Sequence, residues 1–137
     1  GNAVLIKSGY PYCDAISPES TLLILQANNP DRQGQPRPVE KLCSGQTLLC
    51  KSLGLKVPDW DNQRFDQQRL YVEDCGLSVP EVIQTTRLGI PQGRDEDLPY
   101  RFVDAQFARY CTKNPLRRGQ IEGQDFWCLA AGQPIKA

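Results

Sequence analysis

The chain has 137 residues, which is enough for one medium-sized domain or two small ones. Its 16 basic and 16 acidic residues leave no net charge, which argues against nucleic acid and anionic membranes as partners. Histidine is absent, so these residues offer no Ser-His-Asp or Cys-His machinery, and no apolar run approaches the ~20 residues of a membrane span.

The first quarter of the chain predicts a strand followed by a helix. The apolar run 3–6 is typical of a short strand. Ser17-Pro18-Glu19 then favours a helix start, because serine accepts from first-turn amides, proline suits the first helical position and glutamate complements the helix dipole. The apolar residues 21–25 continue this helix, and Asn28-Asn29-Pro30 ends it.

A loop, a strand and a linker follow. Residues 31–40 are rich in proline, glutamine and arginine, which indicates an exposed loop. The apolar residues 47–50 predict a second strand. Residues 56–69 are mostly polar, and we interpret them as a linker between two modules.

The second half of the chain opens with another predicted strand and helix. Residues 70–72 are typical of a strand. Residues 78–81 have the Ser-x-x-Glu spacing of a helix capping box. Val79, Val82 and Ile83 then follow helical spacing, so we expect a helix here.

A further helix and a final strand complete the chain. Loop 89–99 contains the acidic run Asp95-Glu96-Asp97. An amphipathic helix is predicted after this loop, ending near Asn114-Pro115. The helical spacing is carried by Val103, Phe107, Tyr110 and Cys111. Residues 126–129 predict the last strand, and we expect Trp127 to point into its core.

One short pattern occurs twice along the chain. Asn29-Pro30 is followed by a polar loop and by Gly45-Gln46, which leads into an apolar run closed by cysteine. Asn114-Pro115 is followed by a shorter loop and by Gly123-Gln124, which again leads into such a run. The repetition predicts two related modules.

The six cysteines favour disulfide bonds over a metal site. They form no Cys-x-x-Cys pair, and the chain has no histidine to complete a zinc site. We therefore expect an oxidising compartment and a mature, secreted chain without its leader. The cysteines are Cys13, Cys43, Cys50, Cys75, Cys111 and Cys128. Three lie in each half, so full pairing requires at least one bridge between the halves.

The order of these elements resembles the lysin motif, LysM, of fungal secreted effectors. LysM modules have a Ser-Gly turn after the first strand, similar to Ser8-Gly9 here, and a cysteine that opens the first helix, similar to Cys13. Their second helix ends in Asn-Pro, and a Gly-Gln turn leads into the last strand. Asn29-Pro30 with Gly45-Gln46 matches that arrangement in the first half.

The resemblance implies an α+β fold made of two small β-α-α-β modules, joined by disulfides into one compact unit. Module 1 is expected over residues 1–55, the linker over 56–69, and a divergent module 2 with an inserted loop over 70–137.

The resemblance also implies a non-enzymatic protein that binds N-acetylglucosamine polymers, such as chitin oligomers or peptidoglycan glycans. It implies no catalytic residue, no metal and no cofactor. The sugar would lie in shallow grooves on the two modules. The expected carbohydrate-binding residues are Gly9, Tyr10, Pro11, Tyr12, Asn28, Asn29, Pro30 and Asp31 in the first module, and Lys113, Asn114 and Pro115 in the second.

Several alternatives remain open at this stage. The protein could be a secreted effector or toxin that binds a host protein and has lost sugar binding. A small hydrolase could use the carboxylates of residues 95–97, although a solvated loop explains them more simply. Tyr10 and Tyr12 could pack against their own helix, Asn29 could simply end a helix, and Arg117-Arg118 could be an ordinary basic surface spot.

Overall fold

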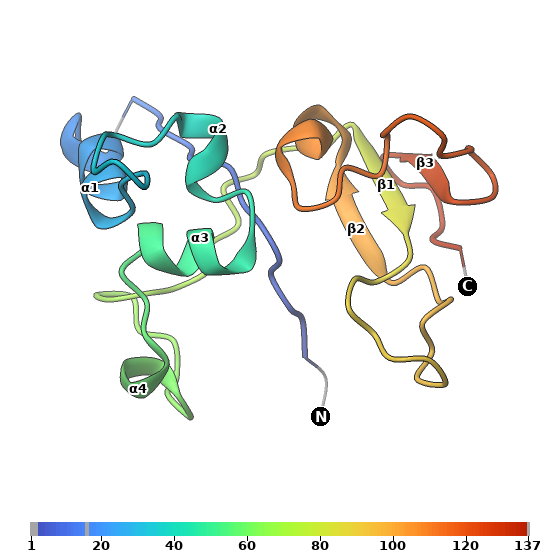
Figure 1. Cartoon of the computed structure of the whole chain (residues 1–137), viewed down its shortest axis with the longest axis horizontal. Helices are drawn as coiled ribbons and strands as arrows, with labels where there is room; N and C mark the ends of the chain where they lie inside the picture. The colour runs from blue at the N-terminus through green and yellow to red at the C-terminus, as the bar shows by residue number, and fades with distance from the viewer. Residues whose placement is uncertain (1–2, 16, 137) are drawn as a thin grey trace. The chain divides into compact units, whose positions relative to one another are not determined.

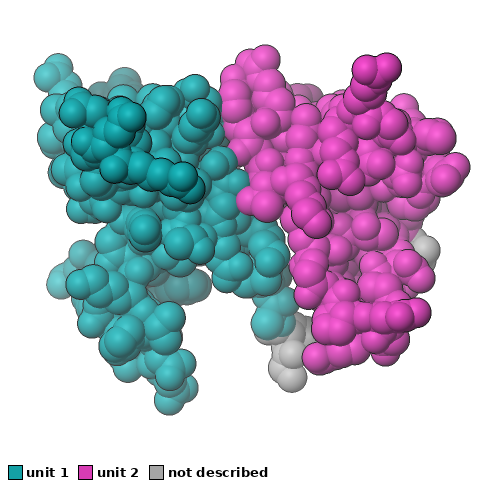
Figure 2. All heavy atoms as spheres, in the orientation of Figure 1, with its two compact units in different colours: residues 1–75 teal, residues 76–137 magenta. Residues whose placement is uncertain are grey.

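A computed structural model describes residues 3–15 and 17–136 of the chain (Figure 1). The chain divides into two compact units, Gly1–Cys75 and Gly76–Ala137, shown in different colours in Figure 2. Unit 1 is helical and unit 2 is built on a small sheet. None of the helices in the described ranges has the length and apolar character that crossing a bilayer requires.

The described residues of unit 1 form four helices: α1 (Ser20–Asn28), α2 (Val39–Leu42), α3 (Gln46–Ser52) and α4 (Val57–Trp60). The start of α1 just after Ser17-Pro18-Glu19 confirms the predicted helix. Its end is confirmed too, because the Asn29 N–H donates to the Leu25 carbonyl at 3.2 Å and the following Pro30 has no N–H with which to continue the helix.

The three strands predicted within the residues of unit 1 are wrong. Residues 70–72 form no strand, and only Leu70 takes part in an isolated bridge, with Asp66. Residues 47–50 lie in α3, where the Leu49 N–H donates to the Gly45 carbonyl at 2.8 Å. An apolar run of four residues carries too little periodicity to separate a helix from a strand. Residues 3–6 belong to no strand of the described chain, and the Val4 side chain is 93% exposed.

Unit 2 is a three-stranded antiparallel sheet with a 3-10 helix. Its elements are β1 (Glu81–Thr85), β2 (Arg101–Asp104), the 3-10 helix η1 (Ala105–Tyr110) and β3 (Phe126–Ala130). The strand order is β2-β1-β3, and Ile83 at the centre pairs with Val103 on one side and Cys128 on the other. Ile83, Ala108 and Phe126 form the buried core of this unit.

The helix predicted over residues 79–83 is also wrong, because this segment forms β1. Val82, Ile83 and Thr85 are β-branched and favour the extended chain over a helix. The Pro80 carbonyl extends the pairing by accepting from the Ala131 N–H at 3.0 Å. The central position of β1, paired on both sides, overrides the local capping signal.

The predicted helix near residues 103–111 is partly correct. The chain is extended through β2 and then turns into η1, where the Asp104 carboxylate accepts from the Gln106 N–H at 2.9 Å. The last strand, β3, is confirmed. Its buried residues are Phe126 and Leu129, whereas Trp127 is half-buried, so the expectation for Trp127 is wrong.

The expected fold of two disulfide-linked β-α-α-β modules is therefore wrong. The described part of unit 1 contains no named strand, and all six cysteines are free thiols. Cys43 is buried and behaves as a small apolar side chain rather than as half of a bridge. The finer boundaries at residues 1–55, 56–69 and 70–137 stay a prediction.

Candidate functional site

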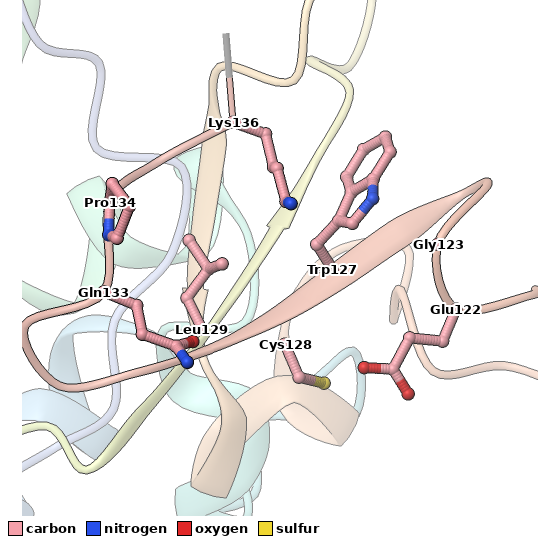
Figure 3. Close-up of a pocket in the computed structure, with 8 residues that line it drawn as sticks. All are labelled: Glu122, Gly123, Trp127, Cys128, Leu129, Gln133, Pro134 and Lys136. Atoms are coloured by element: carbon pink, nitrogen blue, oxygen red, sulfur yellow. The ribbon is translucent and has the colours of Figure 1, made fainter.

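A cavity of about 440 Å³ lies beside β3, the edge strand of unit 2 (Figure 3). One wall is β3 with the turn before it, and the other is the chain that follows β3. The lining residues are Glu122, Gly123, Trp127, Cys128, Leu129, Gln133, Pro134 and Lys136. All of them belong to unit 2.

Gln84 fixes the wall formed by the chain after β3. Its side chain is fully buried in β1. The amide Nε2 donates to the Pro99 carbonyl at 2.8 Å and to the Lys136 carbonyl at 2.7 Å, while Oε1 accepts from the Lys136 N–H at 2.7 Å. Because a buried amide is costly unless its hydrogen bonds are made, this clamp holds Lys136 against the sheet.

Side chains of different chemistry enter the cavity from the two faces of β3. Figure 3 shows the Trp127 indole and the Lys136 ammonium directed toward the same space. The Cys128 thiol points to the other face, as strand alternation requires, toward the Glu122 carboxylate. An indole face with a nearby ammonium is suited to a flat, polar ligand.

The Cys128 thiol is not suited to nucleophilic chemistry. Burial raises its pKa, and the negative charges of Glu122 and Glu81 raise it further. Since the thiolate is the reactive form of cysteine, a raised pKa leaves Cys128 largely protonated and inert near neutral pH. Cys128 is therefore no candidate nucleophile in this cavity.

A second feature of unit 2 is a basic stretch, residues 109–118, which begins with the last two residues of η1 and is called the basic loop below. Its charged side chains are Arg109, Lys113, Arg117 and Arg118, and all four are exposed. No acidic residue occurs between positions 105 and 120, so the carboxylates of unit 2 all lie outside this stretch. The loop is thus a local concentration of positive charge in a chain with no net charge.

The Arg101 side chain of β2 holds the basic loop in place through hydrogen bonds to its backbone. Its guanidinium donates to the carbonyls of Thr112 at 2.6 Å and Lys113 at 3.1 Å, and to the Cys111 sulfur at 3.3 Å. The Cys111 thiol in turn donates to the Ala108 carbonyl at 3.0 Å. Burial raises the pKa of Cys111, while the Arg101 charge acts in the opposite direction.

Local turn chemistry fixes the rest of the basic loop. Lys113 has the left-handed φ of 50°. The Asn114 side chain accepts from the Leu116 N–H at 2.8 Å, and Pro115 is buried. The Arg117 N–H donates to the Asn114 carbonyl at 3.4 Å, which closes the turn. The loop therefore has a defined backbone from which the basic side chains project.

The acidic run at residues 95–97 is a turn element. The Glu96 carboxylate accepts from the N–H groups of Gly93 at 2.9 Å and Arg94 at 3.1 Å. These hydrogen bonds, with that of Gly93 foremost, lower the pKa of Glu96. The carboxylate thus organises its own loop, and no group of His, Cys, Asp and Glu within residues 3–15 and 17–136 could hold a metal ion.

Asn29, expected in the first groove, lies in the interior of unit 1. Its side chain is 2% exposed. The amide Nδ2 lies within hydrogen-bonding distance of the Leu42 carbonyl at 3.1 Å, the Leu48 carbonyl at 3.3 Å and the Ser52 hydroxyl at 3.0 Å. The Ser52 hydroxyl also donates to the Leu42 carbonyl at 2.8 Å. Asn29 therefore links α1 to α2 and α3.

The neighbours of Asn29 are engaged in local structure as well. The Asn28 side chain donates to the Ser52 carbonyl at 3.1 Å. The Pro30 carbonyl accepts from the Arg37 guanidinium at 2.7 Å. The Asp31 carboxylate accepts from the N–H groups of residues 33 and 35, both at 2.8 Å. This half of the expected groove thus serves to join the helices of unit 1.

The other expected residues lie on the surface or in the basic loop. The Gly9 N–H donates to the Cys43 carbonyl at 3.0 Å, which attaches the extended N-terminal segment to unit 1. Tyr10 is exposed, Pro11 is half-buried and Tyr12 is 59% exposed. The second set, residues 113–115, lies within the basic loop described above.

Sequence reasoning missed the Gln84 clamp and the significance of the basic loop. The clamp has no sequence signal, because a glutamine on a central strand is unremarkable until its partners 15 and 52 residues away are known. The basic loop did have a signal. The stretch 105–120 has four basic residues and no acidic one, which the net charge of the whole chain conceals.

Comparison with known proteins identifies relatives of this chain. The profile described as Methylpurine-DNA glycosylase (MPG) matches residues 1–107. A protein of Pseudomonas savastanoi pv. phaseolicola (strain 1448A / Race 6) is 64% identical over 132 residues, which are 96% of this chain and 59% of the relative.

Two further relatives agree with the first. A protein of Pseudomonas fluorescens (strain Pf0-1) is 65% identical over 129 residues, covering 94% of this chain and 56% of the relative. One from Pseudomonas aeruginosa (strain LESB58) is 62% identical over 134 residues, covering 98% and 56%. All three names describe a 3-methyladenine DNA glycosylase. No solved structure matches the chain.

These relationships correct the functional expectations from sequence. The chain spans 56–59% of the length of these relatives, and neither they nor the matching profile is a LysM protein. A family of DNA glycosylases consists of enzymes that act on DNA inside cells. The expectations of a secreted, non-enzymatic, chitin-binding effector that avoids nucleic acid are therefore wrong, and so is the alternative of an effector that binds a host protein. The chain belongs to the methylpurine-DNA glycosylase family.

Proposed function

We propose that this protein acts as a 3-methyladenine DNA glycosylase. The observation that carries the proposal is the 62–65% identity to relatives of that name over 94–98% of the chain. The reaction would break the N-glycosidic bond between a methylated purine and deoxyribose, with water supplying the new hydroxyl at the sugar. The free base and an abasic site in DNA would be the products.

The reaction requires extrusion of the target nucleotide and binding of the DNA phosphates, and unit 2 offers groups for the second of these. A glycosylase must reach an atom that is shielded in the duplex, and it does so by extruding the target nucleotide from the stack. The protein must then hold the distorted DNA by its phosphates. The basic loop supplies exposed guanidinium and ammonium groups for the second task.

The described residues support a role in binding more clearly than a role in bond cleavage. Burial raises the pKa of the Cys43, Cys111 and Cys128 thiols, which makes them poor nucleophiles. The cavity beside β3 is lined by the Trp127 indole, the Lys136 ammonium and the Glu122 carboxylate, and that carboxylate lies beside the Cys128 thiol. We therefore assign no catalytic residue within this chain.

Release of the free base tests the proposal. The protein would be incubated with duplex DNA treated with a methylating agent, and 3-methyladenine in the supernatant would be quantified by mass spectrometry. We expect release that grows with time and with protein concentration, and none from untreated DNA. The P. aeruginosa relative serves as the reference. Release by that relative, but none by this protein, would contradict the proposal.

A further inference from the structure

We propose that the basic loop of unit 2, residues 109–118, binds the phosphate backbone of duplex DNA. The inference rests on the proposed function in one respect, namely that DNA is the macromolecule on which the protein acts. It adds the surface that makes contact, the groups that carry the contact and the kind of contact, which is electrostatic and independent of base sequence.

Positive charge is concentrated in the basic loop. The four basic residues of the loop fall within ten consecutive positions that contain no carboxylate. In contrast, Arg94 stands directly before the acidic run 95–97. A cluster of one sign produces a local potential even when the whole molecule is neutral, and such a potential attracts a polyanion.

The backbone of the basic loop is fixed before any ligand binds. Arg101 holds the carbonyls of Thr112 and Lys113, and the Asn114 side chain closes the following turn. Pro115 is buried, so the loop is attached to the body of unit 2 in its middle. A preformed loop loses little backbone entropy on binding, which leaves more of the electrostatic free energy for affinity.

The basic side chains of the loop are suited to phosphate oxygens. Arg117 and Arg118 are adjacent and exposed, next to the exposed Gly119. Arginine presents planar N–H groups that match phosphate oxygens, and lysine supplies a compact point charge. Arg109 lies over the Tyr110 ring at 4.6 Å from its centroid, which restricts the orientation of its guanidinium.

The salt dependence of DNA binding tests the proposal. Binding of a fluorescent, unmethylated 20-base-pair duplex would be followed by anisotropy between 50 and 200 mM salt. Each phosphate contact contributes about 0.9 to the slope of log K against log salt. We expect Arg117→Gln with Arg118→Gln to reduce the slope by about 1.8, and Arg117→Lys with Arg118→Lys to retain it.

Unit 1 offers a matched control. Arg32 and Arg64 are exposed arginines that stand close to carboxylates, with Asp31 directly before Arg32. Arg32→Gln with Arg64→Gln changes the total charge by the same amount and should leave the slope unchanged. Thermal unfolding of both double variants would verify that each is folded. Equal slopes for both double variants, or no binding of the duplex at 50 mM salt, would overturn the proposal.

The same experiment separates this inference from the proposed function. The duplex carries no methylated base, so the measured slope is independent of glycosylase chemistry. If Arg117→Gln with Arg118→Gln lowers the slope but the unchanged protein releases no methylated base, the loop contacts DNA and the proposed enzyme activity is refuted. If the unchanged protein releases the base but the double variant keeps its slope, the enzyme activity stands and the DNA-contacting loop is refuted. Vesicles of phosphatidylserine and phosphatidylcholine form a further arm, and loop-dependent binding to them without binding to DNA would also overturn the proposal.

Discussion

The two units of this chain place the same short motif in different structures. In unit 1 the motif is Asn29-Pro30, with the asparagine buried and the proline exposed. In unit 2 it is Asn114-Pro115, with the proline buried and the asparagine half-buried. Asn29 joins three helices through its amide, whereas Asn114 only closes a local turn.

The second part of the motif differs as well. Gly45-Gln46 opens α3, and Gly123-Gln124 forms a turn before β3, where Gly123 has a φ of 83°. The positive φ of Gly123 uses the conformational freedom of glycine, whereas Gly45 has an extended backbone that any residue can adopt. The repeat therefore specifies two places where the chain turns, and the contacts of each unit decide which element follows.

The largest expected difference between the units is in stability. Asn29→Ala should lower the free energy of unfolding by about 3 kcal/mol, because buried carbonyl and hydroxyl groups lose their donor in a low-dielectric interior. Asn114→Ala should cost less than about 1 kcal/mol, because it removes one exposed turn contact. Urea unfolding measures both values. Equal losses would show that the two asparagines play equivalent roles.

The Gln84 clamp gives a smaller effect confined to unit 2. Gln84→Met keeps the side-chain length but leaves the partners of the amide unsatisfied, so we expect a loss of about 2 kcal/mol. Amide hydrogen exchange at Lys136 should accelerate. The control is Gln133→Met, which removes only an exposed contact with the Ala130 N–H. If Lys136 exchanged at the same rate in both variants, the clamp would have no role.

The smallest expected effect is on pH dependence. Burial raises the pKa of Cys43 in unit 1 and of Cys111 and Cys128 in unit 2. A raised folded-state pKa favours the neutral thiol, so this stability is fully present below the unfolded thiol pKa of about 8.5 and is lost as pH rises through the folded value. Melting temperatures should therefore fall on the alkaline side.

Alanine variants of single cysteines show how much each unit contributes to the alkaline fall in melting temperature. Cys43→Ala should flatten part of the alkaline loss, because it removes a buried thiol whose pKa is raised. A melting temperature that rose between pH 8 and pH 10 would have the wrong sign for this account. Thiol counting on the denatured, unreduced chain should return all six groups, in agreement with free cysteines.

The sequence predicted those elements whose signals are local and strong. Helix α1 was predictable because it begins just after Ser17-Pro18-Glu19 and stops before Pro30. The expected serine cap is not formed, since Glu19 is the N-cap without a side-chain hydrogen bond and the Ser17 hydroxyl bonds to Asp14. Strand β3 was predictable from its apolar and aromatic residues. In contrast, β1 is a strand because it pairs on two sides with segments that are distant in the sequence, and no local pattern reports such pairing.

The functional expectations failed for related physical reasons. A cysteine count predicts disulfides only if the compartment is oxidising, and the chain itself does not encode its compartment. Net charge averages over the whole molecule, so it obscured the four basic residues of the loop at 109–118. Asn29 was expected on a groove because the helix stop was visible, while its buried partners Leu42 and Ser52 were not.

Hydrogen exchange with and without duplex DNA compares the two Asn-Pro segments most directly. The account predicts that DNA slows exchange of the amides within residues 109–118. The backbone N–H of Asn29 already donates to the Leu25 carbonyl, so it should exchange at the same rate with and without DNA. Protection of residues 28–31 by DNA, with no change across residues 109–118, would contradict the account.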